Sequence, residues 1–278
     1  MKKTTITITA PSSHFKATMK NFKAGVRTLE NSGAVVRCSN NIFKKDGTFA
    51  GTLKERSADI IDAIKDKKTD VIMFARGGYG MAQLLPMLDK HNIAPYIKNK
   101  KFVGCSDITA LFCFLYTKYG KKCFYGPNVN NHNLAKKIVP ATDIKIKHLV
   151  KTKNNVIAGR FFGGCLSVIT SLVGTKYLKK LDGHILFIED VNEPPYKIDR
   201  MLTQLLQAGI IKRIKAIAVG SMKNCDAGHQ TWKAPVTRIA KILDVPVIYG
   251  INAGHGGFDF VLPLGGKSVI KQSHLYLK

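Results

Sequence analysis

The residues from Phe102 to Thr109 read FVGCSDIT, and this stretch indicates the fold class more strongly than any other part of the chain. Its apolar beginning is typical of a buried strand that breaks at Gly104, and an apolar helix is predicted to begin near Asp107. Ser106 therefore lies at a strand-to-helix turn, close to backbone N–H groups and to the positive end of a helix. A serine at this place can simply cap the helix, or its hydroxyl can attack a substrate.

The same order of strand, turn and helix recurs through the first half of the chain. Strands are predicted over residues 4–10, 34–38, 70–74 and 101–104, and helices over about 15–31, from Thr52, near 81–89 and from Asp107. This repeated order favours a doubly wound, mostly parallel sheet, in which functional groups gather at the carboxyl ends of the strands. Ser106 and the glycine-rich loop 77–80 both directly follow predicted strands.

A lysine-rich, weakly periodic segment at about 133–154 is expected to separate two domains. We predict an N-terminal domain over 1–140 and a C-terminal domain over 155–278. In the second half, strands near 156–161, 185–189, 214–220, 246–249, 259–262 and 268–276 are mixed with helices near 164–173, 196–208 and 233–243. Because the last strands follow one another without a helix between them, we expect a smaller, mixed α/β C-terminal domain.

The composition is typical of a soluble globular protein. The chain has 278 residues, of which 45% are hydrophobic, and this is enough for a sizeable core. The N-terminus alternates apolar and polar residues like a strand and unlike a signal peptide, and no apolar run approaches the roughly 20 residues of a membrane span. Six cysteines are scattered without a C-x-x-C pair, so we expect free thiols and a cytoplasmic protein.

The net charge of +26, from 44 basic and 18 acidic residues, raises the possibility of a nucleic-acid partner. However, 36 of the basic residues are lysines, and they are spread along the whole chain without a recognisable nucleic-acid-binding module. We therefore expect a lysine-coated surface and no specific nucleic-acid partner. The charge still favours weak, salt-sensitive attraction to anionic partners.

Two side chains of the second half could support an attacking serine. Glu189 ends an apolar predicted strand, and His255 lies in a glycine-flanked loop that directly follows another strand. A histidine can act as the base for a serine, and a carboxylate can hold that histidine in its working tautomer. The alternatives are a surface cluster of carboxylates or a metal site formed by Glu189, Asp190 or Glu193 with His255, but no metal-ligand spacing such as H-E-x-x-H is present.

The sequence Gly-Gly-Tyr-Gly at 77–80 connects a predicted strand to a helix. Glycines at such a place let backbone N–H groups approach a ligand closely, and a bound phosphate is one possibility. The run matches neither the dinucleotide fingerprint nor a P-loop. We therefore expect this loop to donate an N–H group to an oxyanion near Ser106, with the N–H of Asp107 as the second donor.

Several longer runs carry a family resemblance. They are FAGT at 49–52, ARGGYG at 75–80 with LLP at 84–86, GCSDITAL at 104–111, ED at 189–190 with PYKIDRML at 195–202, and GHG at 254–256 with LPLG at 262–265. In these runs the chain resembles the LD-carboxypeptidases, the muramoyltetrapeptide carboxypeptidases of bacterial cell-wall recycling. The likeness extends in unbroken order from Ile6 to about Gly265.

This resemblance implies a serine peptidase that releases the C-terminal D-alanine from the murein tetrapeptide. Carried over by position, Ser106 is the nucleophile, Glu189 the orienting acid and His255 the base, and the N–H groups of Gly78 and Asp107 form the oxyanion hole. The family also implies a flavodoxin-like N-terminal domain with the nucleophile, a C-terminal domain that supplies the acid and the histidine, a homodimer, and no required cofactor or metal.

Two positions depart from the family's usual pattern. Cys105 replaces an aromatic residue before the nucleophile, and Cys165 replaces the asparagine of a Gly-Gly-Asn run. Cys105 could itself be considered as the nucleophile, but strand alternation points its side chain away from that of Ser106. Arg76 either binds a substrate carboxylate or forms a structural ion pair, and Tyr79 is a candidate residue of the substrate pocket.

Two other functions remain open at this point. A related serine peptidase of the microcin-C immunity type would cleave a different acylated peptide. A non-catalytic basic module that binds murein or RNA is favoured only by the charge.

Overall fold

The computed structural model describes residues 3–131, 140–152, 154 and 156–278. The chain divides into two compact units, Met1–Ile138 and Val139–Lys278. Residues 132–139, at the start of the lysine-rich segment, lie outside the described residues. The same holds for residue 155, the predicted first residue of the second domain.

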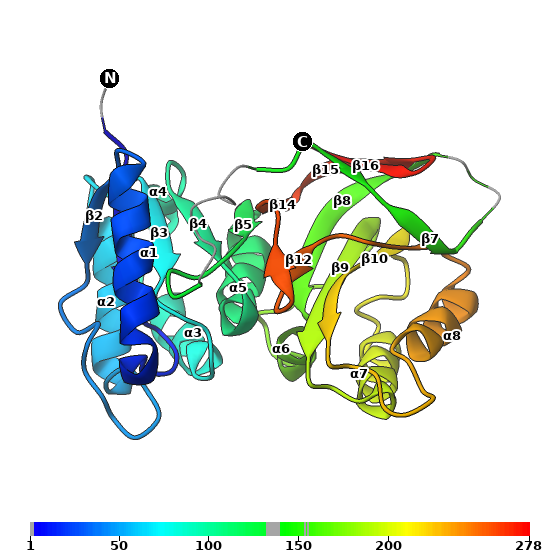
Figure 1. The fold of residues 1–278 in the computed structure, drawn as a ribbon, viewed down its shortest axis with the longest axis horizontal. Helices are drawn as coiled ribbons and strands as arrows, with labels where there is room; N and C mark the ends of the chain where they lie inside the picture. The colour runs from blue at the N-terminus through cyan, green and yellow to red at the C-terminus, as the bar shows by residue number, and fades with distance from the viewer. Residues whose placement is uncertain (1–2, 132–139, 153, 155) are drawn as a thin grey trace. The chain divides into compact units, whose positions relative to one another are not determined.

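The first unit contains a parallel sheet in the blue-to-green part of Figure 1. Its strands are β1 (Thr5–Thr9), β2 (Val35–Cys38), β3 (Val71–Phe74), β4 (Lys101–Gly104) and β5 (Cys123–Tyr125). Within the unit the strand order is β5-β4-β3-β1-β2, and each neighbouring pair is parallel. This is the flavodoxin-like order of a doubly wound sheet, so ligand sites are expected beyond the carboxyl ends of β1, β3 and β4.

The helices of this unit connect successive strands. They are η1 (Lys16–Thr18), α1 (Met19–Asn31), α2 (Leu53–Lys65), α3 (Met81–Asp89), α4 (Ala94–Ile97), η2 (Ser106–Ile108) and α5 (Thr109–Tyr119). Thr52 begins α2 with a capping box, because its hydroxyl accepts the Glu55 N–H at 3.3 Å while the Glu55 carboxylate accepts the Thr52 N–H at 2.9 Å. Helix α5 is buried from Thr109 to Tyr116, so it belongs to the core of the unit.

The second unit, coloured green to red in Figure 1, holds an eight-stranded mixed sheet. Its strands and helices are β6 (Asp143–Lys145), β7 (Lys147–Val150), β8 (Val156–Cys165), α6 (Leu166–Ser171), β9 (His184–Val191), α7 (Pro195–Gln207), β10 (Ala216–Lys223), α8 (Lys233–Leu243), β11 (Val247–Tyr249), β12 (Ala253–Gly254), β13 (Gly257–Phe258), β14 (Leu262–Leu264), β15 (Gly266–Lys271) and β16 (His274–Leu277). The order of this sheet is β6-β16-β15-β8-β9-β10-β11-β7.

The centre of this sheet is parallel and its borders are antiparallel. Strands β8, β9, β10 and β11 run parallel, as expected for strands joined through α6, α7 and α8. Strand β9, with the sequence HILFIEDV, is buried from His184 to Asp190 and forms the middle of the core. Gly163 lets β8 lie close to β9, because a Cβ at that position would be 1.8 Å from the carbonyl oxygen of Phe187.

The observed fold confirms the predicted class, a doubly wound parallel sheet followed by a mixed α/β unit. Two details differ from the sequence expectations. Residues 143–150, which lie outside both predicted domains, supply β6 and β7 to the second sheet, so the second unit is about as long as the first rather than smaller. The strand predicted over 268–276 is a hairpin of β15 and β16, because the chain turns at residues 272–273.

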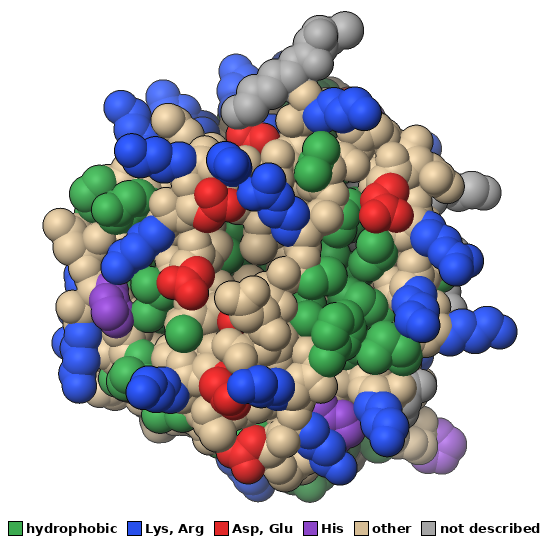
Figure 2. All heavy atoms as spheres, turned by 90° about the vertical axis from the view of Figure 1, so that its left-hand side faces the viewer, with side chains coloured by type: hydrophobic (Ala, Val, Ile, Leu, Met, Phe, Trp, Pro, Cys, Tyr) green, Lys and Arg blue, Asp and Glu red, His purple; other side chains and the backbone are tan. Residues whose placement is uncertain are grey.

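Charged side chains are abundant on the face of the molecule shown in Figure 2. On the face shown in Figure 2, the Lys and Arg side chains are distributed over the whole view with acidic side chains among them. No helix in the described part of the chain is long and apolar enough to cross a membrane.

Candidate active site

Ser106 begins η2, separated from β4 only by Cys105, and has a left-handed backbone, with φ at 62°. This conformation is uncommon for a residue with a side chain, and such strain is concentrated at functional turns. The Ser106 N–H donates to the hydroxyl of Tyr125 at 3.2 Å, and Tyr125 is fully buried at the end of β5. The hydrogen bond to Tyr125 on the neighbouring strand β5 therefore stabilises the strained turn of the half-buried serine.

Of the two roles considered for Ser106, the structure does not place it at the N-cap position of a helix. The cap position of η2 belongs to Cys105, whose side chain makes no capping hydrogen bond, and Ser106 is the first residue inside the turn. The reason is the left-handed φ of Ser106, because an N-cap residue normally has extended backbone angles. This arrangement is the sharp strand-to-helix turn that places a nucleophilic serine in hydrolases.

The loop Gly77–Gly80 after β3 lies against the same serine. A Cβ at Gly77 would be 2.8 Å from Ser106 Cβ and 2.9 Å from its Oγ, so no larger residue fits there without a shift. Gly78 has φ at 116°, and a Cβ at this position would lie 2.3 Å from the hydroxyl oxygen of Ser13. Both glycines are therefore required by close packing around Ser106 and Ser13.

Two backbone N–H groups at this edge, one on an exposed and one on a buried residue, lack an acceptor within the described part of the chain. Among the described residues, neither the Gly78 N–H nor the Asp107 N–H donates a hydrogen bond to another group. Gly78 is exposed, and Asp107 directly follows the serine in η2. Two unsatisfied donors beside a serine at a helix start are suited to bind an oxyanion.

The two predicted substrate contacts lie on either side of the glycines. The Arg76 guanidinium donates to the carbonyl oxygen of His14 at 3.2 Å, and among the described residues Arg76 forms no ion pair. Tyr79 exposes 61% of its surface, and its ring centroid lies 5.9 Å from that of Phe49. Both side chains are accessible beside the glycine loop, and the predicted alternative of a structural ion pair for Arg76 is not observed in the described part of the chain.

In the second unit, Glu189 and His255 form a hydrogen-bonded pair. Glu189 lies near the carboxyl end of β9 and is fully buried. Its Oε2 accepts the backbone N–H of His255 at 2.8 Å and lies 2.8 Å from His255 Nδ1, while Oε1 lies 3.1 Å from the same ring nitrogen. The carboxylate thereby holds both the backbone and the ring of the histidine. With Nδ1 bound to Glu189, Nε2 is the ring atom suited to exchange a proton with a substrate.

The surroundings of His255 favour the protonated form of its ring. Burial alone would lower the pKa of His255, but the hydrogen bond that its ring donates to Glu189 and the negative charges of Glu189 and Asp190 outweigh this effect, so the pKa is raised above its usual value. The carboxylate therefore stabilises the imidazolium form, as a base that accepts a proton during a reaction requires.

A tight hairpin presents His255. Strands β12 and β13 pair with each other, and His255 and Gly256 form the two-residue turn between them. A Cβ at Gly254 would lie 2.3 Å from Glu189 Oε2, so this glycine makes room for the carboxylate. On the other side, the Gly256 N–H donates to the hydroxyl of Ser221 on β10 at 2.7 Å. The turn is thus fixed from two neighbouring strands.

Asp190, the residue after Glu189, has a separate structural role. It is buried, and its carboxylate accepts the Ser167 N–H at 2.7 Å and the Val191 N–H at 2.9 Å. Burial raises the pKa of Asp190 despite these hydrogen bonds. Cys165, which replaces the family's asparagine, lies with its Sγ 3.6 Å from Asp190 Oδ1, and burial also raises the pKa of its thiol.

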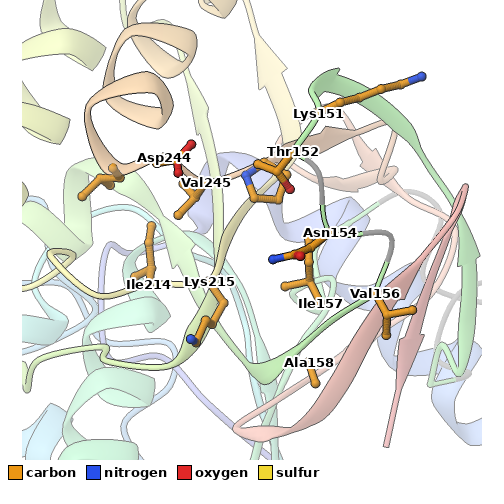
Figure 3. Close-up of a pocket in the computed structure, with 12 residues that line it drawn as sticks. Lys151, Thr152, Asn154, Val156, Ile157, Ala158, Ile214, Lys215, Asp244 and Val245 are labelled. Atoms are coloured by element: carbon orange, nitrogen blue, oxygen red, sulfur yellow. The ribbon is translucent and has the colours of Figure 1, made fainter.

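Other possible binding features lie elsewhere. In the described ranges, no three His, Cys, Asp or Glu side chains come together in a way that could hold a metal ion, so the alternative of Glu189, Asp190 or Glu193 with His255 as ligands is not assembled there. A cavity of about 1030 Å³ opens at the amino ends of the parallel strands of the second unit (Figure 3), lined by residues that include Lys151, Lys215 and Asp244. Glu189 lies near the opposite, carboxyl end of β9, so this cavity is separate from the candidate site.

Sequence reasoning missed several residues that support the candidate site. Tyr125 ends β5 and Asn128 follows it, and this three-residue strand is too short to give a clear sequence pattern. Asn128 accepts the Cys105 N–H through its Oδ1 at 3.4 Å, and Ser13 accepts the Tyr79 N–H at 3.2 Å. Such contacts join residues far apart in the chain, so no local signal could have identified them.

A serine in a strained strand-to-helix turn, unsatisfied N–H donors beside it, and a buried carboxylate bound to a histidine are the groups that serine hydrolases use. The family model for the LD-carboxypeptidase N-terminal domain matches residues 6–126, and that for the LD-carboxypeptidase C-terminal domain matches residues 158–270. The chain therefore belongs to the LD-carboxypeptidase family of peptidases.

Individual relatives agree with this assignment. A carboxypeptidase-like protein of Rickettsia conorii is 31% identical over 276 residues, which cover 92% of this chain and 84% of the relative. The microcin C7 self-immunity protein of Escherichia coli is 28% identical over 306 residues, covering 91% of this chain and 86% of that protein. Among solved structures, a muramoyltetrapeptide carboxypeptidase from Oxalobacter formigenes has a TM-score of 0.85 at 28% identity, covering 99% of this chain and 98% of that one.

Proposed function

We propose that the protein is a serine LD-carboxypeptidase that releases the C-terminal D-alanine from the murein tetrapeptide. The observation that carries this proposal is the Glu189–His255 pair, in which the buried carboxylate lies 2.8 Å from Nδ1 and supports a histidine that accepts a proton through Nε2. The similarity to the muramoyltetrapeptide carboxypeptidase structure supports the choice of substrate.

The proposed reaction begins with Ser106. His255 Nε2 removes the hydroxyl proton as Ser106 Oγ attacks the carbonyl carbon of the L-configured centre that precedes D-alanine. The negative charge of Glu189 stabilises the imidazolium that forms, and the raised pKa of His255 is in keeping with this role. The strained backbone of Ser106 fixes the position of the attacking oxygen.

The negative charge of the substrate then moves to its carbonyl oxygen. The N–H groups of Gly78 and Asp107 bind this oxyanion, because both are donors without an acceptor within the described residues. The imidazolium of His255 returns its proton to the amine of the departing D-alanine as the peptide bond breaks. The remaining peptide is now an ester of Ser106, and a water molecule activated by His255 hydrolyses it and restores the serine.

We also propose substrate contacts at the glycine loop. The Arg76 guanidinium donates one hydrogen bond to the His14 carbonyl oxygen. Its other N–H groups can donate to the terminal carboxylate of the peptide. Tyr79, exposed beside it, lines the binding site. This assignment predicts that Arg76→Met raises KM more than it lowers kcat.

Two properties of the family are part of the proposal. We place the enzyme in the cytoplasm, because its six cysteines are scattered along the sequence without a C-x-x-C pair, as is typical of proteins of a reducing compartment. We also propose that it is a homodimer, as the family resemblance implies. Size-exclusion chromatography with light scattering tests the oligomeric state, and a mass of one chain, 30.7 kDa, would contradict it.

The proposal is tested by incubating the purified protein with murein tetrapeptide and measuring free D-alanine. Wild type and Cys105→Ala are expected to release D-alanine, and Ser106→Ala is expected to lose nearly all of this activity. An excess of chelator should leave the rate unchanged, since no step uses a metal. Absence of release by the wild type would contradict the function, and equal release by Ser106→Ala would contradict the assigned nucleophile.

A second candidate function is supported by the similarity to the microcin C7 self-immunity protein. In this alternative the same serine chemistry cleaves a different acylated peptide of the microcin-C type instead of a murein peptide. Comparing kcat/KM for the tetrapeptide with that for aspartyl sulfamoyl adenosine, which is bound in a solved structure of the microcin C7 self-immunity protein, separates the two candidates. Our proposal predicts the higher value for the tetrapeptide.

A further inference from the structure

The side chain of Asp107 joins three loops at the carboxyl edge of the first sheet. Its Oδ2 accepts the hydroxyl of Ser12 at 2.6 Å and the N–H of Met81 at 2.8 Å. Ser12 follows β1, Met81 begins α3 directly after the glycine loop, and Asp107 itself follows β4. All three residues are buried, so water does not replace these hydrogen bonds easily.

A buried arginine holds two of the same loops from the side. The Arg56 guanidinium donates to the carbonyl oxygens of Pro11 at 2.6 Å and Gly80 at 3.2 Å, and it lies 4.4 Å from the ring centroid of Phe49. Only 2% of Arg56 is exposed, although no carboxylate in the described residues forms an ion pair with it. Burying a guanidinium that is satisfied mainly by backbone carbonyls costs free energy of folding. We take this cost to indicate that the position of the loops which Arg56 joins is important.

These contacts fix the place of the glycine loop relative to Ser106. The Gly78 N–H lies on a loop that ends at Met81, where the Asp107 carboxylate holds the first N–H of α3. The Asp107 N–H belongs to the same residue as that carboxylate. The Asp107 side chain therefore links the loop of one donor to the residue of the other, and an oxyanion hole works only when both donors point to one oxygen position.

We propose that Asp107, through its carboxylate, and Arg56 are positioning residues that set the spacing of the Gly78 and Asp107 N–H groups and thereby the capacity of the site to bind an oxyanion. This inference rests on the proposed serine chemistry at Ser106. Neither side chain touches the reacting atoms, and both act through the loops after β1, β3 and β4.

The charge state of this group is part of the same arrangement. Burial raises the pKa of Asp107, while the hydrogen bonds from Ser12 and Met81 and the positive charge of Arg56 oppose that rise. The positive charge of Arg56 on α2 therefore favours the ionised form of the Asp107 carboxylate. An ionised carboxylate accepts stronger hydrogen bonds than a neutral one, so the loop is held more firmly when Asp107 is charged.

The test compares Asp107→Asn with a matched control, Asp59→Asn. Asp59 is also a buried acid of the first unit, but it accepts hydrogen bonds from Ser39 and Asn41 after β2, away from the glycine loop. With murein tetrapeptide, Asp107→Asn should lower kcat roughly 10- to 100-fold with KM changed less than about threefold, because a displaced oxyanion donor weakens only the transition state. Asp59→Asn should leave kcat within about threefold of wild type.

A second readout needs no substrate. Hydrogen exchange of the amides of residues 77–81 should become faster in Asp107→Asn than in wild type and remain unchanged in Asp59→Asn. Where Asp107→Asn does not fold, Ser12→Ala serves instead, since it removes one of the two hydrogen bonds and retains the acid. Its kcat should fall by a smaller factor, and Ser12→Thr should restore it.

The outcomes separate this inference from the proposed function. If wild type releases no D-alanine, the proposed function fails, while faster exchange at 77–81 in Asp107→Asn still supports the positioning role. If wild type is active and Asp107→Asn keeps its kcat, or loses it in equal measure with Asp59→Asn, the positioning role is refuted. Unchanged exchange at 77–81 in Asp107→Asn refutes it as well.

Discussion

Replacing Glu189 by glutamine removes the charge beneath His255 while keeping the shape of the side chain. Oε2 accepts two N–H groups of His255 at 2.8 Å each, so the amide oxygen of glutamine should take this position and retain both hydrogen bonds. The lost interaction is that between a negative carboxylate and the positive imidazolium of the transition state. The predicted change is therefore mainly electrostatic.

The magnitude follows from the geometry of the pair. The Glu189 oxygens lie 2.8 and 3.1 Å from Nδ1, and at an effective dielectric constant of about 20 the attraction between the charges is about 5 kcal/mol. This energy corresponds to a fall in kcat of roughly 10³- to 10⁴-fold. The pKa of His255, raised by Glu189 in the wild type, should also fall, so the acid limb of the kcat profile should move to lower pH.

The assay is D-alanine release measured from about pH 5 to pH 9, with Asp190→Asn as the control. Asp190 is equally buried beside Glu189, but its carboxylate binds the N–H groups of Ser167 and Val191, so its replacement should lower stability and change kcat less than about 10-fold. A Glu189→Gln protein with kcat within 10-fold of wild type and an unmoved acid limb would refute the role given to Glu189.

Of three further predictions, two concern residues of the candidate site and one concerns a residue far from it in the sequence. Gly254→Ala places a methyl group at 2.3 Å from Glu189 Oε2 on a backbone with φ at 132°, so kcat and the melting temperature should both fall, and wild-type values of both would contradict this account. His255→Gln should remove a pH-dependent part of the stability: because folding raises the pKa of His255, that stability is present below about pH 6.5 and lost as pH rises through the folded value. Urea unfolding should therefore show a larger difference between wild type and this variant at about pH 5.5 than at about pH 9. Thr52→Ala should cost about 1 kcal/mol of unfolding free energy by removing the capping box of α2, with kcat unchanged, and a loss of activity without a loss of stability would contradict it.

The parts of the fold that sequence predicts well are those with strong local patterns. The buried strand Val71–Phe74 and the capped helix Leu53–Lys65 have clear apolar periods and a clear start signal, and the structure contains both. Ser106 was expected at a strand-to-helix turn for the same reason. The short strand Cys123–Tyr125 was missed, because three residues give too little pattern to distinguish a strand from a loop.

The supporting contacts of the site could not be predicted, because they join distant parts of the chain. The hydrogen bond between Ser12 and Asp107 spans 95 residues, and that between Glu189 and His255 spans 66. Local patterns placed Glu189 and His255 only at strand ends, and their pairing was predicted from the family resemblance and not from any physical signal in the sequence. Similarly, the left-handed backbone of Ser106 depends on packing against Gly77 and on the hydroxyl of Tyr125.

The central claim is that Ser106 forms a covalent acyl-enzyme, and mass spectrometry of the rapidly quenched reaction tests it most directly. With murein tetrapeptide in excess, we predict that the protein gains the mass of the tetrapeptide minus the mass of D-alanine. This modification should be located on Ser106 in the digested protein and be absent in Ser106→Ala. The same modification on Cys105, or release of D-alanine with no modified serine at any reaction time, would contradict the account.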